Sequence, residues 1–426
     1  MDSPERPELE FRAGRARCYS DGRGEDLLER AREGLLTAGE KARAAEAEML
    51  LGQLACLRGE RERAVHLQRA RALVADAPAS RSKAAVLEGC MKHLTVADRH
   101  GEAVGVAKEA LAMARELGLR ELEASVLGTS GIARITHGDT SGVADLRRCI
   151  AICEELGSSM VINWNINLAF AYSILGDLPS CFAARTAAWR AAERFGAVRF
   201  MRWVEIERVA EDYWTGRWEH ALQVADALTS ATDGGARHYL ESDTRIWRGR
   251  IQLARGDVDG ALADAERALE LARESGDPQN LNPALAFTAR AQLAAGRPDR
   301  AAELIDGLLD GIGHELLKPD LGIDLGIDLV ELDRSVAVLD GALPSRWLDA
   351  AKAFVAGDPR QAAEVYAQIG SRPDEAYAHL EAARRLSAAG RATEARAEAE
   401  AALRFYREVG ATAYVEEGER LCFAVA

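Results

Sequence analysis

The sequence predicts an all-α protein, a right-handed α-solenoid in which pairs of helices stack along the chain. Alanine, leucine, arginine and glutamate dominate its 426 residues, and these residue types favour helices. Only 11 prolines interrupt them, and few segments carry Val, Ile and Thr at a period of two, as strands do. A pattern of glycine and alanine also recurs through most of the chain, which is typical of stacked two-helix units.

The repeat is built on a glycine that is followed five residues later by an alanine. The six strong copies are Gly59/Ala64, Gly216/Ala221, Gly256/Ala261, Gly296/Ala301, Gly357/Ala362 and Gly390/Ala395. Weaker copies begin at Asp98, Gly138 and Gly176. From Gly59 to Gly296 the markers follow one another at steps of 38 to 40 residues, and so regular a spacing indicates one repeated unit.

Each position of the repeat has a physical role in a helix pair. The glycine ends the first helix, because it adopts the left-handed backbone that a side chain resists. A small residue seven positions before it lets the paired helix approach closely. In the copy that begins at Gly256, the second helix carries an apolar stripe of Ala261, Leu262, Ala265, Ala268, Leu269 and Ala272. Asp264, Arg267 and Glu274 lie off this stripe, and we expect them to face solvent.

These marks favour tetratricopeptide-like pairs, although HEAT-type repeats also have a period of about 40 residues. We interpret residues 1–426 as a single solenoid of about ten or eleven pairs. A degenerate pair at 9–40 would cap the N-terminus, and a helix at 412–425 would cap the C-terminus. The step from Gly296 to Gly357 is 61 residues, which predicts an irregular pair at 310–345.

Composition excludes several classes of function. The formal net charge is −14, and an acidic chain repels the phosphate backbone of nucleic acids. The seven cysteines are scattered without a framework spacing, which indicates a reducing compartment. The N-terminus lacks the apolar core of a signal peptide, and no run of about 18 apolar residues occurs. We therefore predict a cytoplasmic protein that binds neither nucleic acid nor a membrane.

Motifs for catalysis and cofactors are missing or incomplete. No Gly-Lys dipeptide occurs, which argues against the phosphate-binding loop of Walker-type ATPases. The segments 22–24 and 311–313 begin like dinucleotide fingerprints but lack the third glycine, so we interpret them as turns. His314-Glu315 lacks the second histidine of a zincin helix. We predict no catalytic residue, no metal site and no cofactor.

Two clusters of candidate metal ligands have plainer explanations. Cys149 and Cys153 share a helical face, but no second pair of Cys or His residues stands near them, and buried cysteines commonly act as small apolar side chains. Asp320, Asp324 and Asp328 are too widely spaced for a calcium loop. We interpret these three as the solvated face of a weak helix.

Several phrases resemble one group of proteins beyond the generic repeat. They are His238–Glu241, Arg255–Glu266, Ile369–Ala378 and Phe405–Thr412. From about residue 9 to its end, the chain resembles the C-terminal repeat region of large actinobacterial regulators, which carry a nucleotide cyclase domain and an AAA-type or STAND-type ATPase before the repeats. The resemblance implies a regulatory arm that controls an ATPase or cyclase output. The sequence lacks those catalytic domains, so their activities do not transfer to it.

The best candidate site is a surface. The first helices of successive pairs would line a concave groove that can hold a peptide or a helix. Mid-chain first helices are rich in polar and aromatic residues, and Arg and Trp often anchor interfaces. The candidate partner-binding residues are Asn163, Asn167, Arg202, Trp203, Arg245, Arg248 and Arg250. Alanine in place of Arg245, Arg248 and Arg250 should weaken the binding of a partner without unfolding the helix stack. The plainer explanation is that aromatics pack between helices and arginines pair with nearby carboxylates.

Three functions are compatible with these observations. The first is a non-enzymatic module that binds a protein or peptide partner on its concave face and controls a signalling NTPase or cyclase. The second is the detached C-terminal arm of a multidomain adenylate or guanylate cyclase, or of an ATP-dependent transcriptional regulator. The third is a small-ligand sensor with a pocket inside the superhelix. A homo-oligomer is compatible with all three.

Overall fold

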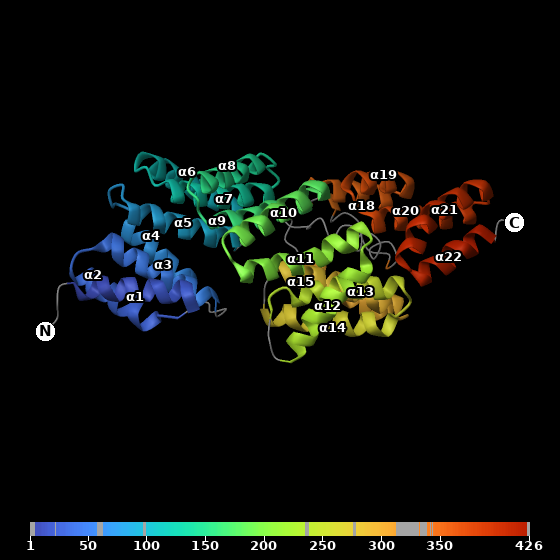
Figure 1. Ribbon diagram of the computed structural model, residues 1–426, viewed down its shortest axis with the longest axis horizontal. Helices are drawn as coiled ribbons and strands as arrows, with labels where there is room; N and C mark the ends of the chain where they lie inside the picture. Colours follow the sequence, from blue (N-terminus) through green and yellow to red (C-terminus); the bar gives the residue numbers. More distant parts are fainter. Residues whose placement is uncertain are drawn as a thin grey trace. The chain divides into compact units, whose positions relative to one another are not determined.

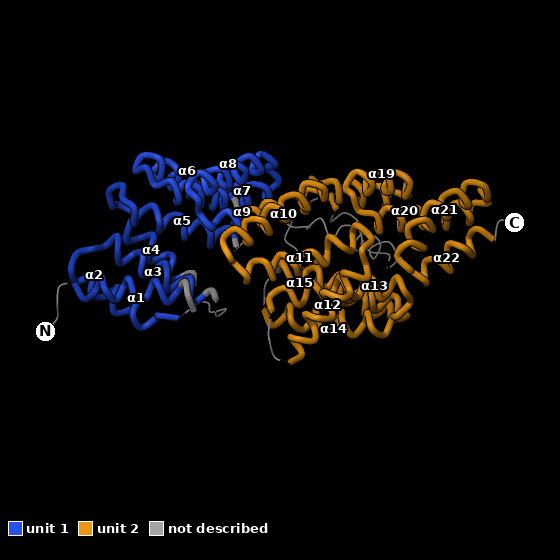
Figure 2. Tube along the Cα trace, viewed as in Figure 1, with its two compact units in different colours: residues 1–164 blue, residues 165–426 orange. Residues whose placement is uncertain are grey.

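The computed structural model describes residues 5–21, 23–57, 63–96, 99–234, 238–275, 278–311, 332, 339–340, 342 and 344–423. In these residues the protein is all-α, with 21 helices and no strand (Figure 1). The chain divides into two compact units, residues 1–164 and 165–426, and the boundary falls inside one helix, α9 (Figure 2). Each unit is a stack of helix pairs, so the predicted all-α fold of tetratricopeptide-like pairs is confirmed.

The first unit is a regular stack. Its helices are α1 (Arg6–Asp21), α2 (Glu25–Thr37), α3 (Lys41–Leu57), α4 (Arg63–Val74), α5 (Arg81–Val96), α6 (His100–Glu116), α7 (Arg120–Thr136), α8 (Gly142–Glu155) and the beginning of α9 (Met160–Leu175). The two helices of each pair from α1 to α8 pack on each other, and α1 packs on α3, α3 on α5 and α5 on α7. Each pair thereby buries its apolar face against the next one, as stacked repeats require.

The second unit contains the remainder of α9 and all later helices. They are α10 (Leu178–Arg194), α11 (Val198–Thr215), α12 (Trp218–Asp233), α13 (Glu241–Ala254), α14 (Val258–Ser275), α15 (Pro278–Ala294), α16 (Pro298–Gly311), α18 (Arg346–Val355), α19 (Pro359–Ile369), α20 (Arg372–Ala388), α21 (Ala392–Val409) and α22 (Thr412–Phe423). Here α11 packs on α13 and α13 on α15, as in the first unit. In addition, α11 contacts α20 and α13 contacts α22, so helices far apart in sequence meet.

The marker glycines end helices as the repeat predicts. Gly216 directly follows α11 with φ of 86°, a left-handed backbone that favours glycine. The markers with positive φ are Gly138, Gly176, Gly216, Gly256, Gly296, Gly357 and Gly390. Seven residues before Gly138, a Cβ on Gly131 would lie 2.7 Å from the backbone oxygen of Gly142 on α8, so a small residue allows this pair to pack. Gly59 and Asp98 lie outside the described residues.

The apolar stripe of the best repeat lies on α14, and its six residues are buried as predicted. One neighbour differs from expectation. Asp264 is only 3% exposed, so the prediction that it faces solvent is wrong. The reason is that two arginines of α13, Arg245 and Arg248, reach its carboxylate and compensate its charge. A periodic pattern shows which face of a helix is apolar, but it does not show a buried ion pair.

The other sequence-based expectations concern either two cysteines, which the structure describes, or residues that lie outside the described ranges. Cys149 and Cys153 are buried on α8, which confirms that they pack as small side chains. Most of the irregular pair predicted at 310–345 lies outside the described residues, as do His314-Glu315 and the aspartates at 320, 324 and 328. Gly22 and residues 312–313 lie outside them too. Among the helices that are described, none is both long and apolar enough to cross a bilayer.

Candidate functional site

Arg245 lies inside the second unit rather than on an open surface. It is 6% exposed, and its guanidinium is surrounded by three carboxylates. Nε donates to Glu241 Oε1 at 3.0 Å, Nη1 to Asp264 Oδ1 at 3.2 Å and Nη2 to Asp233 Oδ1 at 2.8 Å. These bonds join α13 to α12 and α14. A buried cation that is held in this way is part of the architecture, because its removal would take the cation from buried Glu241 and leave buried Asp264 with Arg248 alone.

Arg248 belongs to the same network. Its Nε and Nη2 both donate to the Asp264 carboxylate at 2.6 Å, a bidentate pair, and Nη1 donates to Asp226 Oδ1 at 2.8 Å. Burial opposes the charge of Arg248, but the hydrogen bonds to Asp264 and Asp226 outweigh burial and raise its pKa above the ordinary value. Because these contacts join α12, α13 and α14, we now expect alanine at Arg245 and Arg248 to destabilise the stack. A role of these arginines in binding a partner stays a prediction.

Arg250 and the two asparagines have other surroundings. The Arg250 guanidinium lies over the Trp247 ring at 5.1 Å and over the Phe287 ring at 5.7 Å, a cation–π arrangement that joins α13 to α15. Asn163 is exposed at the end of the first unit, and Asn167 is half-buried at the start of the second. Both lie on α9. Their proposed contact with a partner stays a prediction.

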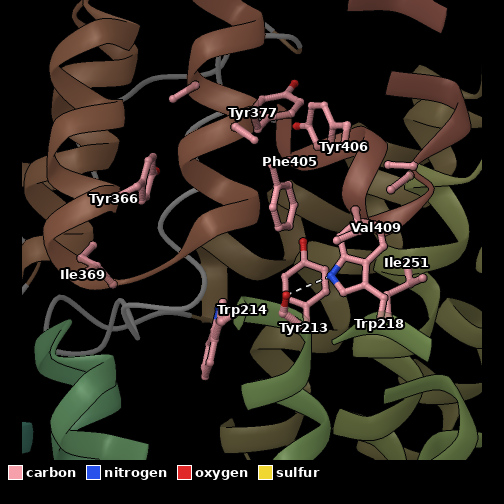
Figure 3. Packing of buried hydrophobic residues seen from close by; sticks show 14 of the residues in the cluster. Tyr213, Trp214, Trp218, Ile251, Tyr366, Ile369, Tyr377, Phe405, Tyr406 and Val409 are labelled. Carbon is pink, nitrogen blue, oxygen red and sulfur yellow. Dashed lines mark hydrogen bonds between the residues drawn. The ribbon is translucent and has the colours of Figure 1, made fainter. Parts of the chain in front are cut away.

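Large aromatic residues of the first helices form the core of the second unit. Trp214 on α11 contacts the Trp247 ring at 4.9 Å and the Trp347 ring of α18 at 6.1 Å. The Trp347 indole Nε1 donates to the Ser173 carbonyl of α9 at 2.7 Å. Figure 3 shows aromatic side chains from the later helices, among them Phe405, facing Tyr213 and Trp218 of the earlier ones. In this unit the chain's own helices α18 to α22 thus cover these aromatics, as the plainer explanation expected.

Arg202 and Trp203 have a different environment, near the start of α11. Here the sequence places Val198, Arg199, Arg202 and Trp203 within two helical turns, and the turn before α13 adds His238 and Tyr239. We call these six residues the aromatic–basic patch. Trp203 stacks on Tyr239 with ring centroids 5.8 Å apart and an interplanar angle of 14°. Tyr239 is 48% exposed and Val198 is 71% exposed, so the patch presents apolar surface to solvent.

Hydrogen bonds hold two side chains of the patch, and two exposed arginines give it positive charge. The Trp203 indole Nε1 donates to Glu207 Oε1 at 2.9 Å, which fixes the ring, and the Leu240 amide donates to His238 Nδ1 at 3.1 Å. Arg199 and Arg202 are exposed, and neither pairs with a carboxylate of the described residues. Partial burial, together with the charges of Arg202 and Arg199, lowers the pKa of His238 from its ordinary value. The patch thus combines a stacked aromatic platform with two available guanidinium groups.

The sequence located only part of this patch. Arg202 and Trp203 were candidates because arginine and tryptophan often anchor interfaces. Helical periodicity does not indicate His238 and Tyr239, because both belong to the turn before α13. The sequence does contain one signal for them, which is the distance along the chain from Trp203 on α11 to Tyr239 in the turn before α13. That separation becomes informative only when the two are known to be neighbours in the stack.

Comparisons with known proteins support no assignment of function. No protein-family model matches the chain, and no curated protein matches it significantly. A Rap protein complexed with Competence and Sporulation Factor is 14% identical, with a TM-score of 0.47, over 71% of this chain and 77% of that chain. NprR in complex with its cognate peptide NprX is 13% identical, with a TM-score of 0.46, over 69% and 86%. A STAND protein with a tetratricopeptide repeat sensor from Pyrococcus horikoshii is 12% identical, with a TM-score of 0.41, over 81% and 55%. Likenesses this distant transfer no ligand or partner to this chain.

Proposed function

We propose that this chain is a non-enzymatic interaction module that binds an acidic peptide segment of a partner protein at the aromatic–basic patch. The observation that carries the proposal is the stacked pair Trp203 and Tyr239, flanked by arginines that no carboxylate of the described residues pairs. The chain as a whole has a formal net charge of −14, so an exposed basic patch with aromatics stands out from its surroundings.

The chemistry of the patch favours a peptide that carries both charge and apolar groups. Tryptophan, tyrosine and arginine are the residues that most often dominate binding energy. The Trp203 ring is already held by Glu207, so little side-chain freedom is lost when a partner docks. The arginines can form charge-assisted bonds with carboxylates, and an aliphatic or aromatic side chain of the partner can cover Val198 and Tyr239. Opposite charge would also speed the encounter.

The resemblance described above suggests the class of partner. We propose a signalling NTPase or nucleotide cyclase, whose output the bound module would control. A chain that is the arm of a larger regulator would meet this partner within the same protein, and an independent chain would meet it as a separate subunit. A homo-oligomer is compatible with either arrangement. The concave face predicted from the first helices remains a second candidate surface, with Asn163 and Asn167 as its untested residues.

A random peptide library displayed on phage tests the proposal with the full chain as bait. We expect the enriched peptides to carry Asp or Glu beside a large apolar residue. Their synthetic versions should bind more weakly as salt rises, because exposed charges are screened. The double variant Arg199→Glu/Arg202→Glu should lose binding by at least about tenfold, since charge-assisted bonds to the peptide become repulsions.

The matched control is Arg190→Glu/Arg404→Glu. Both of these arginines are exposed in the second unit, neither pairs with a carboxylate of the described residues, and the change of charge is the same. Binding that falls equally in both double variants would indicate a general effect of net charge and would overturn the proposed patch. Enrichment of peptides without acidic residues would overturn the class of ligand. A match between enriched peptides and an ATPase or cyclase of the same genome would support the proposed partner.

A further inference from the structure

The aromatic–basic patch carries more positive charge than one carboxylate would balance. Arg199 and Arg202 are three residues apart on α11, so their side chains leave the same face of the helix. Both are exposed, and neither pairs with a carboxylate of the described residues. The first turn of α11 contains no acidic residue. Two guanidinium groups without a counter-charge among the described residues therefore share one face, in a chain whose formal net charge is −14.

Two carboxylates of the same elements are engaged with other arginines. Glu207 accepts the Trp203 indole N–H and lies 3.7 Å from Nε of Arg185, a residue of α10 that is 6% exposed. Glu241, at the start of α13, is buried and pairs with Arg245 at 2.9 Å. Both carboxylates thus balance buried arginines, and they leave the two exposed arginines of the patch to an outside anion.

The imidazole of His238 shows that both exposed guanidinium groups act at one place. Its ring lies 5.8 Å from the Trp203 ring. Partial burial lowers the pKa of His238, the charges of Arg202 and Arg199 lower it further, and Glu241 opposes them. Two side chains that act on one ring both lie within electrostatic range of it, so they can reach the same anion beside that ring.

Given the peptide binding proposed above, on which this inference rests, we propose that the acidic group recognised by the patch is the phosphoryl group of a phosphorylated side chain, held by Arg199 and Arg202. A phosphoryl group carries about −1.5 to −2 charges at neutral pH and three strong acceptor oxygens. A carboxylate carries one charge and two oxygens. Arginine suits phosphate because its fork of N–H groups forms two parallel bonds with the oxygens. Two guanidinium groups on one face therefore favour the phosphoryl group over a carboxylate.

The aromatic part of the patch favours a phosphorylated peptide over other phosphates. Tyr239 stacks on Trp203 and is half exposed, and Val198 is exposed beside them. An apolar residue of the peptide can cover this surface and add to the binding energy, which inorganic phosphate cannot do. A nucleic acid presents a long row of phosphates, and the net charge of −14 opposes such a polyanion.

Oriented peptide libraries test the proposal with the full chain as bait. Each library has random residues around one fixed central residue, which is phosphoserine, phosphotyrosine, glutamate or serine. We expect at least one phosphorylated library to be retained about tenfold more than the glutamate library, and the serine library to be retained least. Retention of the glutamate library equal to that of both phosphorylated libraries would overturn the phosphoryl group and leave acidic-peptide binding in place. No retention of any library above that with serine would overturn both proposals.

The variant Arg199→Gln/Arg202→Gln should bring the ratio of phosphorylated to glutamate retention close to one, because both guanidinium groups are removed. The matched control, Arg190→Gln/Arg404→Gln, removes the same charge from two exposed arginines elsewhere in the second unit and should keep the ratio. All four side chains are exposed, so melting temperatures should stay close to that of the unaltered protein. An equal fall of the ratio in both variants would indicate a general effect of net charge and would overturn the site.

The imidazole of His238 provides a local measurement in the full chain. Phenyl phosphate and benzoate both carry a ring and an anionic group, and they differ in the group under test. Titration of ¹³C-labelled histidine, followed by NMR at constant ionic strength, should show the pKa of His238 rising with phenyl phosphate, because the phosphoryl charge offsets Arg199 and Arg202. Benzoate should cause a smaller rise. An equal rise with benzoate, or a His238 signal that phenyl phosphate leaves unchanged, would overturn the proposal.

Discussion

The two units use the same helix pair but different contacts. In the first unit, the contacts run between neighbours along the chain, and alanine and leucine fill most of the core. The second unit repeats this plan and then adds contacts between helices that are more than 150 residues apart. These contacts are filled by large aromatics such as Trp214, Trp218 and Trp347. Small residues suffice where a repeat stacks on its neighbour, whereas joining distant helices takes bulky side chains.

The largest expected effect comes from breaking the long-range contacts of the second unit. Trp347→Ala removes a buried indole that contacts Trp214 and bonds to the Ser173 carbonyl. We expect a loss of about 3–5 kcal/mol in the free energy of unfolding, as for other large core truncations. Hydrogen exchange should rise in both α9 and α18, although the two are far apart in sequence.

The control for this comparison is Leu146→Ala in the first unit, where Leu146 is buried on α8. It should also destabilise the protein, by about 2–5 kcal/mol. Its effect on hydrogen exchange should stay within α7 and α8, the helices that it joins. Faster exchange in α18 on account of Leu146→Ala would contradict the distinction between local and long-range packing.

Removal of the Arg245 side chain should have the next largest effect on the free energy of unfolding. Arg245→Ala leaves Glu241 and Asp264 buried with one cation fewer, which should cost about 3 kcal/mol in the free energy of unfolding. Arg267→Ala is the comparison, because the ion pair of Arg267 with Glu270 lies at the surface of α14. Exposed pairs contribute about 0–1 kcal/mol. Urea denaturation measures both, and equal losses would show that the network around Arg245 is not structural.

Substitution of two glycines of the first unit should have a smaller effect on stability, and it tests how closely neighbouring helices approach. Gly131→Ala would set a Cβ 2.7 Å from a backbone oxygen of α8, which cannot move aside, and should cost about 2 kcal/mol. Gly118→Ala meets nothing within 4 Å, and its penalty comes only from φ of 65°. We expect about 1 kcal/mol there. Thermal unfolding distinguishes the two, and a larger loss at Gly118 would refute the explanation from close helix approach.

The smallest expected effect is the contribution of His238 to the pH dependence of stability. The pKa of His238 is lowered from 6.5 by partial burial and by the charges of Arg202 and Arg199. The folded state therefore favours the neutral imidazole, and its contribution to stability is present above pH 6.5 and is lost as pH falls below that value. His238→Asn should lose slightly less stability than the unaltered protein between pH 7.5 and about 5.5. Parallel denaturation curves measure the difference, and the opposite sign would contradict the direction of the shift.

Much of the fold could be predicted from local pattern. The spacing of Gly216, Gly256 and Gly296 located helix ends, because a left-handed residue is needed where one helix turns into the next. The stripe on α14 located a buried face, because side chains recur on one side of a helix every 3.6 residues. Arg202 and Trp203 could be selected as candidates by residue type alone. All these features lie within a few helical turns of one another.

The remainder depended on neighbours that a linear pattern does not contain. Asp264 is buried because Arg245 and Arg248 approach it from another helix, and the aromatic–basic patch exists because the turn at Tyr239 meets α11. The contact between Trp214 and Trp347 forms only where α18 docks on a helix more than a hundred residues earlier. The sequence by itself determined the helix pair and its stacking, since backbone conformation and periodicity are local. Only the tertiary structure decided which charges and rings meet, because that depends on shape complementarity between distant segments.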